Sequence, residues 1–378
     1  MESVYWSGLL RRLSPYVPGE QPRDRQFIKL NTNENPYPPS PRVIEAIGRA
    51  AGEALRLYPD PECTELREAV AARYGVKPSQ VFAGNGSDEI LAFAFAAFFP
   101  PSTAGDRAAE RAILFPDITY SFYPVYADLW ALPYRTIPLD GDFAIRPEDY
   151  RIPNGGIIFP NPNAPTGRVL DAAAILSLAE WQERQGRVLI VDEAYIAFGG
   201  QTLIPRISSY PNLLLIHTLS KSASLAGLRA GFAVGQEELI EGLRRVRDSF
   251  NSYTLDRLAQ AAAAAALADG PYYEELARRI VSTRARTAAG LENLGLKVIP
   301  SAANFLFIRF PGLSGAGALA ALRERGILVR RFDRDRIADF LRVSIGADEE
   351  MDRFLRECGP LSRGKVQAGD LVRGGKPV

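Results

Sequence analysis

Leu213-Leu-Leu-Ile-His-Thr218 leads directly into Leu-Ser-Lys221-Ser-Ala-Ser-Leu-Ala-Gly-Leu-Arg229-Ala-Gly231, and this stretch decides the fold. Its first part is mainly apolar, which predicts a buried strand that ends just before Lys221. A lysine amine becomes a nucleophile toward aldehydes when burial or neighbouring cations disfavour its charged form. Lys221 is therefore a candidate nucleophile at the end of a strand.

The groups beside Lys221 suit a phosphorylated ligand. The hydroxyls of Thr218, Ser220 and Ser222 can donate to an anion, and Arg229 supplies a planar cation that suits phosphate. An aldehyde that also carries a phosphate would be held here at both ends. A Ser-Lys pair alone could also be an ordinary surface lysine after a strand. The other segments of the chain decide between a surface lysine and a nucleophile.

A second apolar run, Val188-Leu-Ile-Val191, ends in Asp192. This is the pattern of a fully buried parallel strand whose carboxyl end carries function. A buried carboxylate needs a partner, and a protonated pyridine nitrogen would be one. The hydroxyl of Tyr195 could then reach an oxygen on the same ring. The alternative role for Asp192 is that of a helix cap.

Three further segments fit the same ligand. Gly86, Ser87 and Asp88 open a long apolar stretch, so they lie where the backbone N–H groups of a helix start can bind phosphate. Tyr120 follows an apolar run and could stack on an aromatic ring, with a core tyrosine as the alternative. The stretch Phe159-Pro-Asn-Pro-Asn-Ala-Pro-Thr-Gly167 predicts a rigid loop after a strand.

Together these segments resemble the pyridoxal 5′-phosphate (PLP) enzymes of the aspartate aminotransferase fold type. The resemblance implies that Lys221, Asp192 and Tyr195 are catalytic, and that Lys221 carries a proton between substrate and cofactor. The cofactor-binding residues that it implies are Gly86, Ser87, Asp88, Tyr120, Asn163, Asp192, Tyr195, Thr218, Ser220, Lys221 and Arg229. One position departs from the family pattern. Ala164 stands where an asparagine donates to the cofactor O3′, and Asn163 or Asn161 could replace that donor.

Five more segments narrow the resemblance to the histidinol-phosphate aminotransferase family over residues 13–358. They are Leu13-Ser-Pro-Tyr16, Leu30-Asn-Thr-Asn-Glu-Asn35-Pro-Tyr37, Leu57-Tyr58-Pro-Asp60, and the pair Gly326-Ile-Leu-Val-Arg330 with Leu341-Arg342-Val-Ser-Ile-Gly346. The resemblance implies that Tyr58 reaches the cofactor phosphate of the neighbouring subunit, and thus a homodimer with shared active sites. Substrate recognition would fall to Tyr16, Asn35, Arg330 and Arg342.

The implied reaction transfers the amino group from histidinol phosphate to 2-oxoglutarate, which yields imidazole-acetol phosphate and glutamate in histidine biosynthesis. Both substrates carry anionic groups, so one set of arginines could serve both, unless Arg330 and Arg342 make only structural contacts. An aromatic amino-acid aminotransferase and a lyase similar to threonine-phosphate decarboxylase remain open. A non-enzymatic PLP-binding regulator is disfavoured, because no helix-turn-helix or basic extension precedes the domain.

Composition argues against several classes of protein. The chain has 378 residues, of which 47% are hydrophobic, and a formal net charge of +1, so we expect a large core and neither a nucleic-acid nor a membrane partner. Cys63 and Cys358 are too few for a disulfide framework, and no metal is expected. The absence of a signal-peptide core and of an apolar stretch of about 18 residues predicts a cytoplasmic protein. The single histidine, His217, lies in a predicted strand, so a packed or hydrogen-bonded side chain is expected rather than a catalytic one.

The predicted elements, with the resemblance, indicate an α/β protein of the PLP-dependent transferase fold type I. Strands at 81–82, 112–115, 156–159, 188–191, 213–218 and 231–234, with helices such as 171–183 and 257–268, predict a mainly parallel, doubly wound sheet in a large domain. A helix at 274–291 and strands at 297–299, 304–308, 326–330 and 341–345 predict a smaller α+β C-terminal domain. The expected boundaries are 1–35 for an N-terminal arm within the small domain, 36–271 for the large PLP-binding domain, 272–359 for the small domain and 360–378 for a mobile tail.

Overall fold

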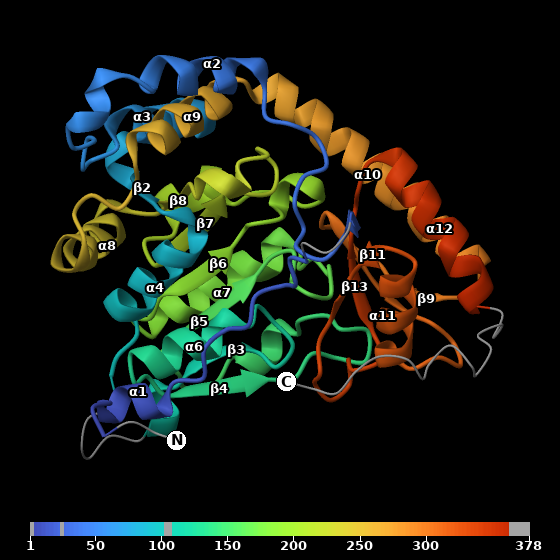
Figure 1. Ribbon diagram of the computed structural model, residues 1–378. Helices are drawn as coiled ribbons and strands as arrows, with labels where there is room; N and C mark the ends of the chain where they lie inside the picture. Colours follow the sequence, from blue (N-terminus) through green and yellow to red (C-terminus); the bar gives the residue numbers. More distant parts are fainter. Residues whose placement is uncertain (1–3, 23–25, 102–107, 363–378) are drawn as a thin grey trace. The chain divides into compact units, whose positions relative to one another are not determined.

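The computed structural model describes residues 4–22, 26–101 and 108–362 of the chain (Figure 1). The chain divides into two compact units, which are described separately. The larger unit consists of Met1–Pro18, Tyr37–Arg278 and Ser301–Ala303, and the smaller unit of Gly19–Pro36, Arg279–Pro300 and Asn304–Val378. A segment near the N-terminus therefore belongs to the same unit as the C-terminal part of the chain.

The larger unit contains a seven-stranded sheet in the order β2-β8-β7-β6-β5-β3-β4. Its strands are β2 (Val81–Gly84), β3 (Ile113–Pro116), β4 (Tyr134–Ile137), β5 (Gly156–Pro160), β6 (Leu189–Asp192), β7 (Leu213–Thr218) and β8 (Gly231–Val234). Every neighbouring pair is parallel except those that β8 forms with β2 and β7. The predicted mainly parallel sheet is confirmed. The edge strand β4 has no apolar run to reveal it, because all but its last residue are exposed.

Helices of the larger unit cover both faces of this sheet, since every residue of β5, β6, β7 and β8 is buried (Figure 1). They are α1 (Gly8–Arg12), α2 (Pro41–Ala50), α3 (Thr64–Tyr74), α4 (Gly86–Phe98), α5 (Ala108–Arg111), α6 (Phe122–Leu129), α7 (Ala172–Arg184), α8 (Glu237–Phe250) and α9 (Arg257–Ala268), with the start of α10 (Gly270–Asn293). Asp171 caps α7, because its carboxylate accepts from the Ala173 N–H at 2.8 Å.

One apolar core holds α4 and α6 against the sheet. Phe93 and Phe95 of α4 and Tyr123 of α6 pack with strand residues such as Ile158 and Ile190, all nearly inaccessible to solvent. Such close packing tolerates little displacement. It therefore fixes the first turn of α4 at the carboxyl edge of the sheet.

The smaller unit combines two small sheets with helices. Its four-stranded sheet is antiparallel, in the order β12-β13-β10-β9, and a separate parallel pair joins β1 to β11. The elements are β1 (Ile28–Lys29), β9 (Lys297–Ile299), β10 (Phe305–Arg309), α11 (Gly315–Glu324), β11 (Ile327–Leu328), β12 (Arg330–Arg331), β13 (Leu341–Ser344) and α12 (Asp348–Ser362). The strand predicted at 326–330 is thus divided between two sheets.

The C-terminal helix α12 continues to Ser362, so residues 360–362 are helical. The rest of the tail predicted at 360–378 lies outside the described residues. No helix in the described parts of the chain has both the length and the hydrophobicity that crossing a bilayer requires.

Candidate active site

The sheet brings the predicted site residues of the larger unit to one edge. Parallel strands β5, β6 and β7 end at the same edge, where Asp192 is the last residue of β6 and Lys221 follows β7. Because β8 runs in the opposite direction, its first residue lies at this edge too. Gly231 pairs with Thr218 on one side and with Gly84 on the other. The start of α4, just after Gly84, therefore lies beside the segment that carries Lys221.

A cup of donors suited to phosphate forms where α4 begins. Glycine is required at Gly86, whose φ is +76°, because a Cβ there would lie 2.7 Å from Arg229 Nη2. A Cβ at Gly231 would lie 2.8 Å from the Ser87 nitrogen, so the start of β8 approaches the helix closely. Arg229 Nη1 donates to Ser220 Oγ at 3.3 Å. Backbone N–H groups of the helix start, a hydroxyl and a guanidinium thus lie together.

Asp88 connects this cup to an aromatic ring. The Tyr120 hydroxyl donates to Asp88 Oδ1 at 2.6 Å, and Arg229 Nη2 donates to Asp88 Oδ2 at 3.0 Å. Burial, with Asp88 beside it, raises the pKa of Tyr120 well above its ordinary value, so this hydroxyl remains a donor. Asp88 thereby orients both the ring and the guanidinium, a bridging role that its position in the sequence does not reveal.

Asp192 is a buried carboxylate that has no charged partner in the part of the chain that the structure describes. It accepts from the Ala194 N–H at 3.1 Å and from the Tyr123 hydroxyl at 3.3 Å, and it forms no ion pair with any described residue. Burial raises its pKa to about 7. A cation placed beside Asp192 would restore its ionised form. Tyr123 was missed by the sequence reasoning, and its signal is the spacing of one helical turn from Tyr120.

The loop after β5 is braced by its own asparagines. Asn163 Nδ2 donates to the Ile118 carbonyl and to Thr166 Oγ1, both at 3.0 Å. Both amide hydrogens are therefore engaged inside the protein, which argues against Asn163 as a donor to a ligand. Asn161 pairs with the backbone of Leu170 through both side-chain atoms. The buried Ala164 offers no donor in place of the missing asparagine.

His217 has a structural role. Its Nε2 lies 2.8 Å from Glu193 Oε2, and its ring stacks on Phe232 with centroids 4.9 Å apart. Glu193 also accepts from the Leu203 N–H at 3.0 Å. The prediction of a packed, hydrogen-bonded histidine is confirmed, so proton transfer at this edge falls to other groups.

Three tyrosines that the sequence singled out have different environments. Tyr195 is buried shortly after β6, at the start of the short helix Ile196–Phe198. Tyr16 stacks on Phe122, with ring centroids 4.3 Å apart. Tyr58 is 78% exposed, and its ring stacks on Tyr253 at 4.6 Å. The Tyr58 hydroxyl is thus presented at the surface of the single chain.

The smaller unit holds Asn35 and the two predicted substrate arginines. Arg330 and Arg342 are direct partners across β12 and β13. Their guanidinium carbons lie 5.8 and 5.4 Å from the centroid of the same ring, Phe332. Arg342 Nη2 also donates to the Asn31 carbonyl at 3.0 Å. Like charges directly opposite each other repel, so an anion bound between the two arginines would stabilise the pair.

Comparisons with known proteins agree with this geometry. The family model for aminotransferase class I and II matches residues 25–357. Over 354 residues the chain is 53% identical to histidinol-phosphate aminotransferase 2 of Thiobacillus denitrificans, covering 93% of this chain and 96% of that protein. It is 51% identical over 359 residues to the histidinol-phosphate aminotransferase of Clostridium acetobutylicum, covering 94% and 99% of the two chains.

A solved structure has the same fold. The crystal structure of histidinol-phosphate aminotransferase from Sinorhizobium meliloti in complex with pyridoxal 5′-phosphate aligns with a TM-score of 0.84, covering 97% of this chain and 99% of that one. The sequence identity is 24%, so this likeness concerns the fold alone. The sequence matches go further, and the chain belongs to the class I and II aminotransferases and, within them, to the histidinol-phosphate aminotransferase family.

Proposed function

We propose that this chain is a PLP-dependent aminotransferase that moves the amino group from histidinol phosphate to 2-oxoglutarate, in histidine biosynthesis. Relatives of 51% and 53% identity that carry the name histidinol-phosphate aminotransferase support this activity. The observation that carries it is the grouping, at one sheet edge, of a lysine, an unpaired buried carboxylate and a cup for phosphate.

The residues present fit PLP. Donors for its phosphate come from the start of α4, from Ser220 and from Arg229. Glycine at position 86 keeps this cup open, because any side chain there would enter it. A protonated pyridine nitrogen beside Asp192 would be a cation that favours the ionised form of this buried carboxylate. When bound, PLP supplies an electron sink that stabilises the carbanion formed at the substrate α-carbon.

Residues of the chain would bind the cofactor, orient it and transfer the proton. Lys221 would hold the cofactor through its amine, and its free amine would take the proton from the substrate α-carbon. Asp192 would favour the protonated form of the ring nitrogen, and Tyr120, whose hydroxyl donates to Asp88, would pack against the ring. Tyr195 is the proposed donor to O3′, since the Asn163 amide is engaged elsewhere.

The arginine pair of the smaller unit is the proposed site for the anionic group of each substrate. Arg330 and Arg342 share one aromatic ring and face each other across the sheet, so a phosphate or a carboxylate could accept from both. Tyr16 and Asn35 are proposed to complete substrate recognition. An anion with two oxygens gains more from this pair than a neutral aromatic side chain does.

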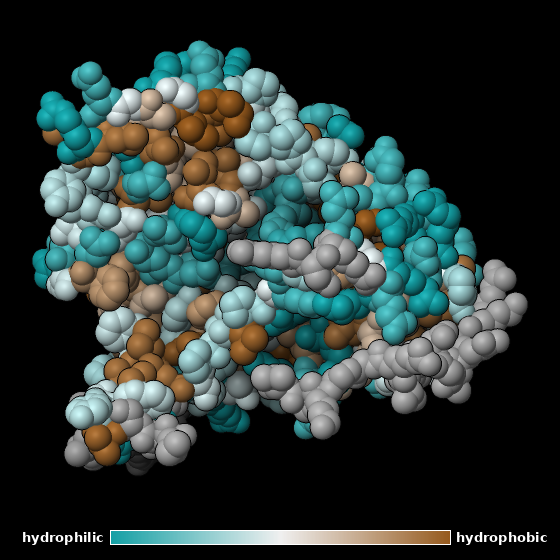
Figure 2. Space-filling model, in the orientation of Figure 1, coloured by the Kyte–Doolittle hydropathy of each residue, from teal (hydrophilic) through white to brown (hydrophobic). Residues whose placement is uncertain are grey.

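A cytoplasmic homodimer is the proposed assembly, with Tyr58 reaching the neighbouring cofactor phosphate. Tyr58 stacks on Tyr253, and both are exposed, as are the large apolar side chains of Leu55, Leu57 and Phe250 in the same unit. Figure 2 shows hydrophobic surface where α3 and α9 lie in Figure 1. Exposed apolar clusters of this kind mark protein interfaces.

One assay separates this proposal from its alternatives. The purified protein is mixed with 2-oxoglutarate and, in turn, with histidinol phosphate, phenylalanine or tyrosine, and glutamate formation is measured. The proposal predicts the highest kcat/KM with histidinol phosphate. A preference for the aromatic amino acids would indicate an aromatic aminotransferase, and release of CO₂ from a carboxylated substrate would indicate a lyase.

A further inference from the structure

The segment from Tyr58 to Cys63 is held along its backbone by side chains of α8 and α9. Three of its carbonyl groups accept from distant residues: Tyr58 from Arg257 at 3.0 Å, Asp60 from Gln260 at 2.9 Å and Pro61 from Arg247 at 2.8 Å. The Asp60 carboxylate also accepts from the N–H groups of Glu62 and Thr64. The segment is therefore ordered by hydrogen bonds although it lies between helices.

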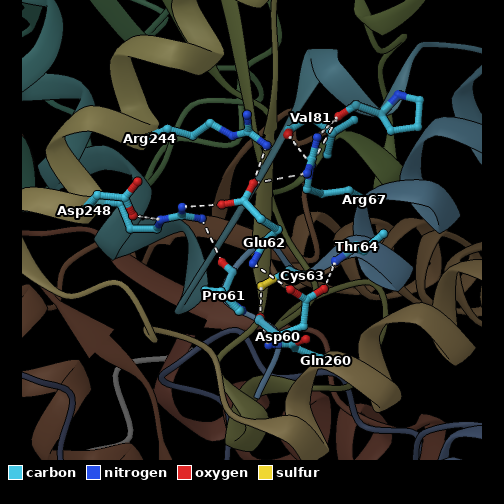
Figure 3. Close-up of polar contacts among 12 residues, drawn as sticks. Asp60, Pro61, Glu62, Cys63, Thr64, Arg67, Val81, Arg244, Asp248 and Gln260 are labelled. Carbon is cyan, nitrogen blue, oxygen red and sulfur yellow. Dashed lines mark hydrogen bonds and ion pairs between the residues drawn. The ribbon is translucent and has the colours of Figure 1, made fainter. Parts of the chain in front are cut away.

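Glu62 is the centre of a charged cluster that anchors this segment. We call Glu62, Arg67, Arg244 and Arg247 the Glu62 node. Arg247 Nη2 donates to Glu62 Oε1 at 2.7 Å, while Arg67 lies 3.4 Å from Oε2 and Arg244 donates to the same oxygen. Figure 3 shows Glu62 between Arg244 and Arg67. One carboxylate thus gathers three guanidinium groups.

The node joins separate parts of the fold. Arg247 has a side chain only 5% exposed, and its Nε donates to Asp248 at 2.8 Å. Arg67 also donates to the carbonyls of Pro78 and Val81, at the start of β2. Exposed ion pairs contribute little, but a buried guanidinium that loses its carboxylate is strongly destabilising. Removing the Glu62 charge would take away the carboxylate that Arg67, Arg244 and Arg247 share, would leave Arg247 paired with Asp248, and would loosen the segment.

We propose that the Glu62 node is a positioning device for Tyr58, and that it holds this tyrosine ready to bind the cofactor phosphate of a second copy of the chain. The inference rests on the proposed function, because it requires shared active sites. Tyr58 is 78% exposed and its ring stacks on Tyr253, so its backbone must be held firmly for its hydroxyl to be placed. The node therefore contributes to the site of the partner, not to that of its own chain.

Hybrid dimers test whether the Glu62 node acts on the cofactor site of the partner chain or on that of its own chain. In the first hybrid, one chain carries both Lys221→Ala and Glu62→Gln, and its partner carries neither change. In the second hybrid, Lys221→Ala is on one chain and Glu62→Gln on the other. Only one chain of each hybrid can bind cofactor through Lys221, so the visible absorbance of lysine-bound PLP, followed during dialysis, reports the affinity of that one site.

The two hybrids contain the same mutations in different arrangements. In the first hybrid, the lysine-bearing site receives Tyr58 from the Glu62→Gln chain, and its PLP affinity should fall about tenfold, the effect of losing one charge-assisted hydrogen bond. In the second hybrid, that site receives Tyr58 from a chain with an intact node, and its affinity should equal that of the Lys221→Ala/wild-type hybrid. Weakening in the second hybrid alone, or in neither, would overturn the inference.

Tyr58→Phe, placed in the same two arrangements, tests the proposed function separately. It should weaken PLP binding about tenfold or more only when it is on the Lys221→Ala chain. If Tyr58→Phe has no effect across the dimer, the shared site itself is wrong. If Tyr58→Phe acts across the dimer and Glu62→Gln does not, only the role of the node is wrong.

A buried thiol reports whether the segment has been released. Cys63 is 4% exposed, and burial raises its pKa to about 12, so it should react slowly with thiol reagents. In a Cys358→Ser background, Glu62→Gln should speed the labelling of Cys63 at least tenfold. Glu241→Gln, which removes an exposed carboxylate paired with Arg245 on α8, is the matched control and should leave labelling unchanged. If Glu62→Gln does not fold, Arg244→Gln replaces it in every arrangement.

Discussion

Replacing Asp192 by asparagine should remove a pH-dependent loss of folding stability from the cofactor-free protein. Asp192 is 4% exposed, and burial raises its pKa to about 7. The pKa of an aspartate in an unfolded chain is about 3.9. The folded protein therefore binds this proton more tightly than the unfolded chain does. The stability that the proton contributes is fully present below about pH 4 and is lost as the pH rises to about 7.

The size of the effect follows from the pKa difference. Within that window, one titrating group changes the free energy of unfolding by about 1.4 kcal/mol per pH unit. Between pH 5 and pH 8 only the interval up to about 7 contributes, so wild type should lose about 3 kcal/mol relative to Asp192→Asn. Bound PLP supplies the missing cation, and in its presence this pH-dependent difference should vanish.

Urea unfolding measures the effect directly. Both proteins are unfolded without PLP at pH 5, 6, 7 and 8, and the difference between their free energies is plotted against pH. Titrating groups that the two proteins share cancel in this difference, provided that their m-values agree. A difference that stays constant within about 0.5 kcal/mol across this range would refute the raised pKa and, with it, the unpaired state of Asp192.

Three further predictions concern the other site residues. Asp88→Ala should weaken PLP binding about tenfold in a dialysis assay, because Tyr120 loses its hydrogen-bond acceptor; unchanged affinity would contradict the bridging role. Arg330→Ala and Arg342→Ala should each lower kcat/KM for histidinol phosphate by about tenfold or more and that for phenylalanine much less, and equal losses would mean that these arginines are structural. Asn163→Ala should lower the free energy of unfolding by about 1–3 kcal/mol while the pKa of the cofactor absorbance stays unchanged, and a shift in that pKa would restore Asn163 as a donor.

Buried strands are the part of the fold that the sequence reveals best. The run Leu213–Thr218 is apolar because helices cover both faces of β7, and its predicted bounds agree with the structure. In the edge strand β4 every residue but the last is exposed, so it carries no such signal. The strand predicted at 326–330 is divided because Ile327–Leu328 pairs with Ile28–Lys29, and a pairing between distant segments leaves no local pattern.

The site shows the same division between local and non-local signals. Asp192 ends one strand and Lys221 follows the next, so chain order alone suggests that they lie at one edge. The bridging role of Asp88 depends on Tyr120 and Arg229, which come from distant parts of the sequence. The Glu62 node likewise exists only once α3 and α8 are folded.

Glutamate formation from histidinol phosphate and 2-oxoglutarate, measured with and without Lys221, tests the central claim most directly. Lys77→Ala is the control, because Lys77 is a lysine of the same unit with a side chain 75% exposed. With PLP present, wild type and Lys77→Ala should form glutamate at equal rates, and Lys221→Ala should lose the activity and the visible absorbance of lysine-bound cofactor while it remains folded. Glutamate formation by Lys221→Ala at the wild-type rate, or none by wild type, would contradict the account.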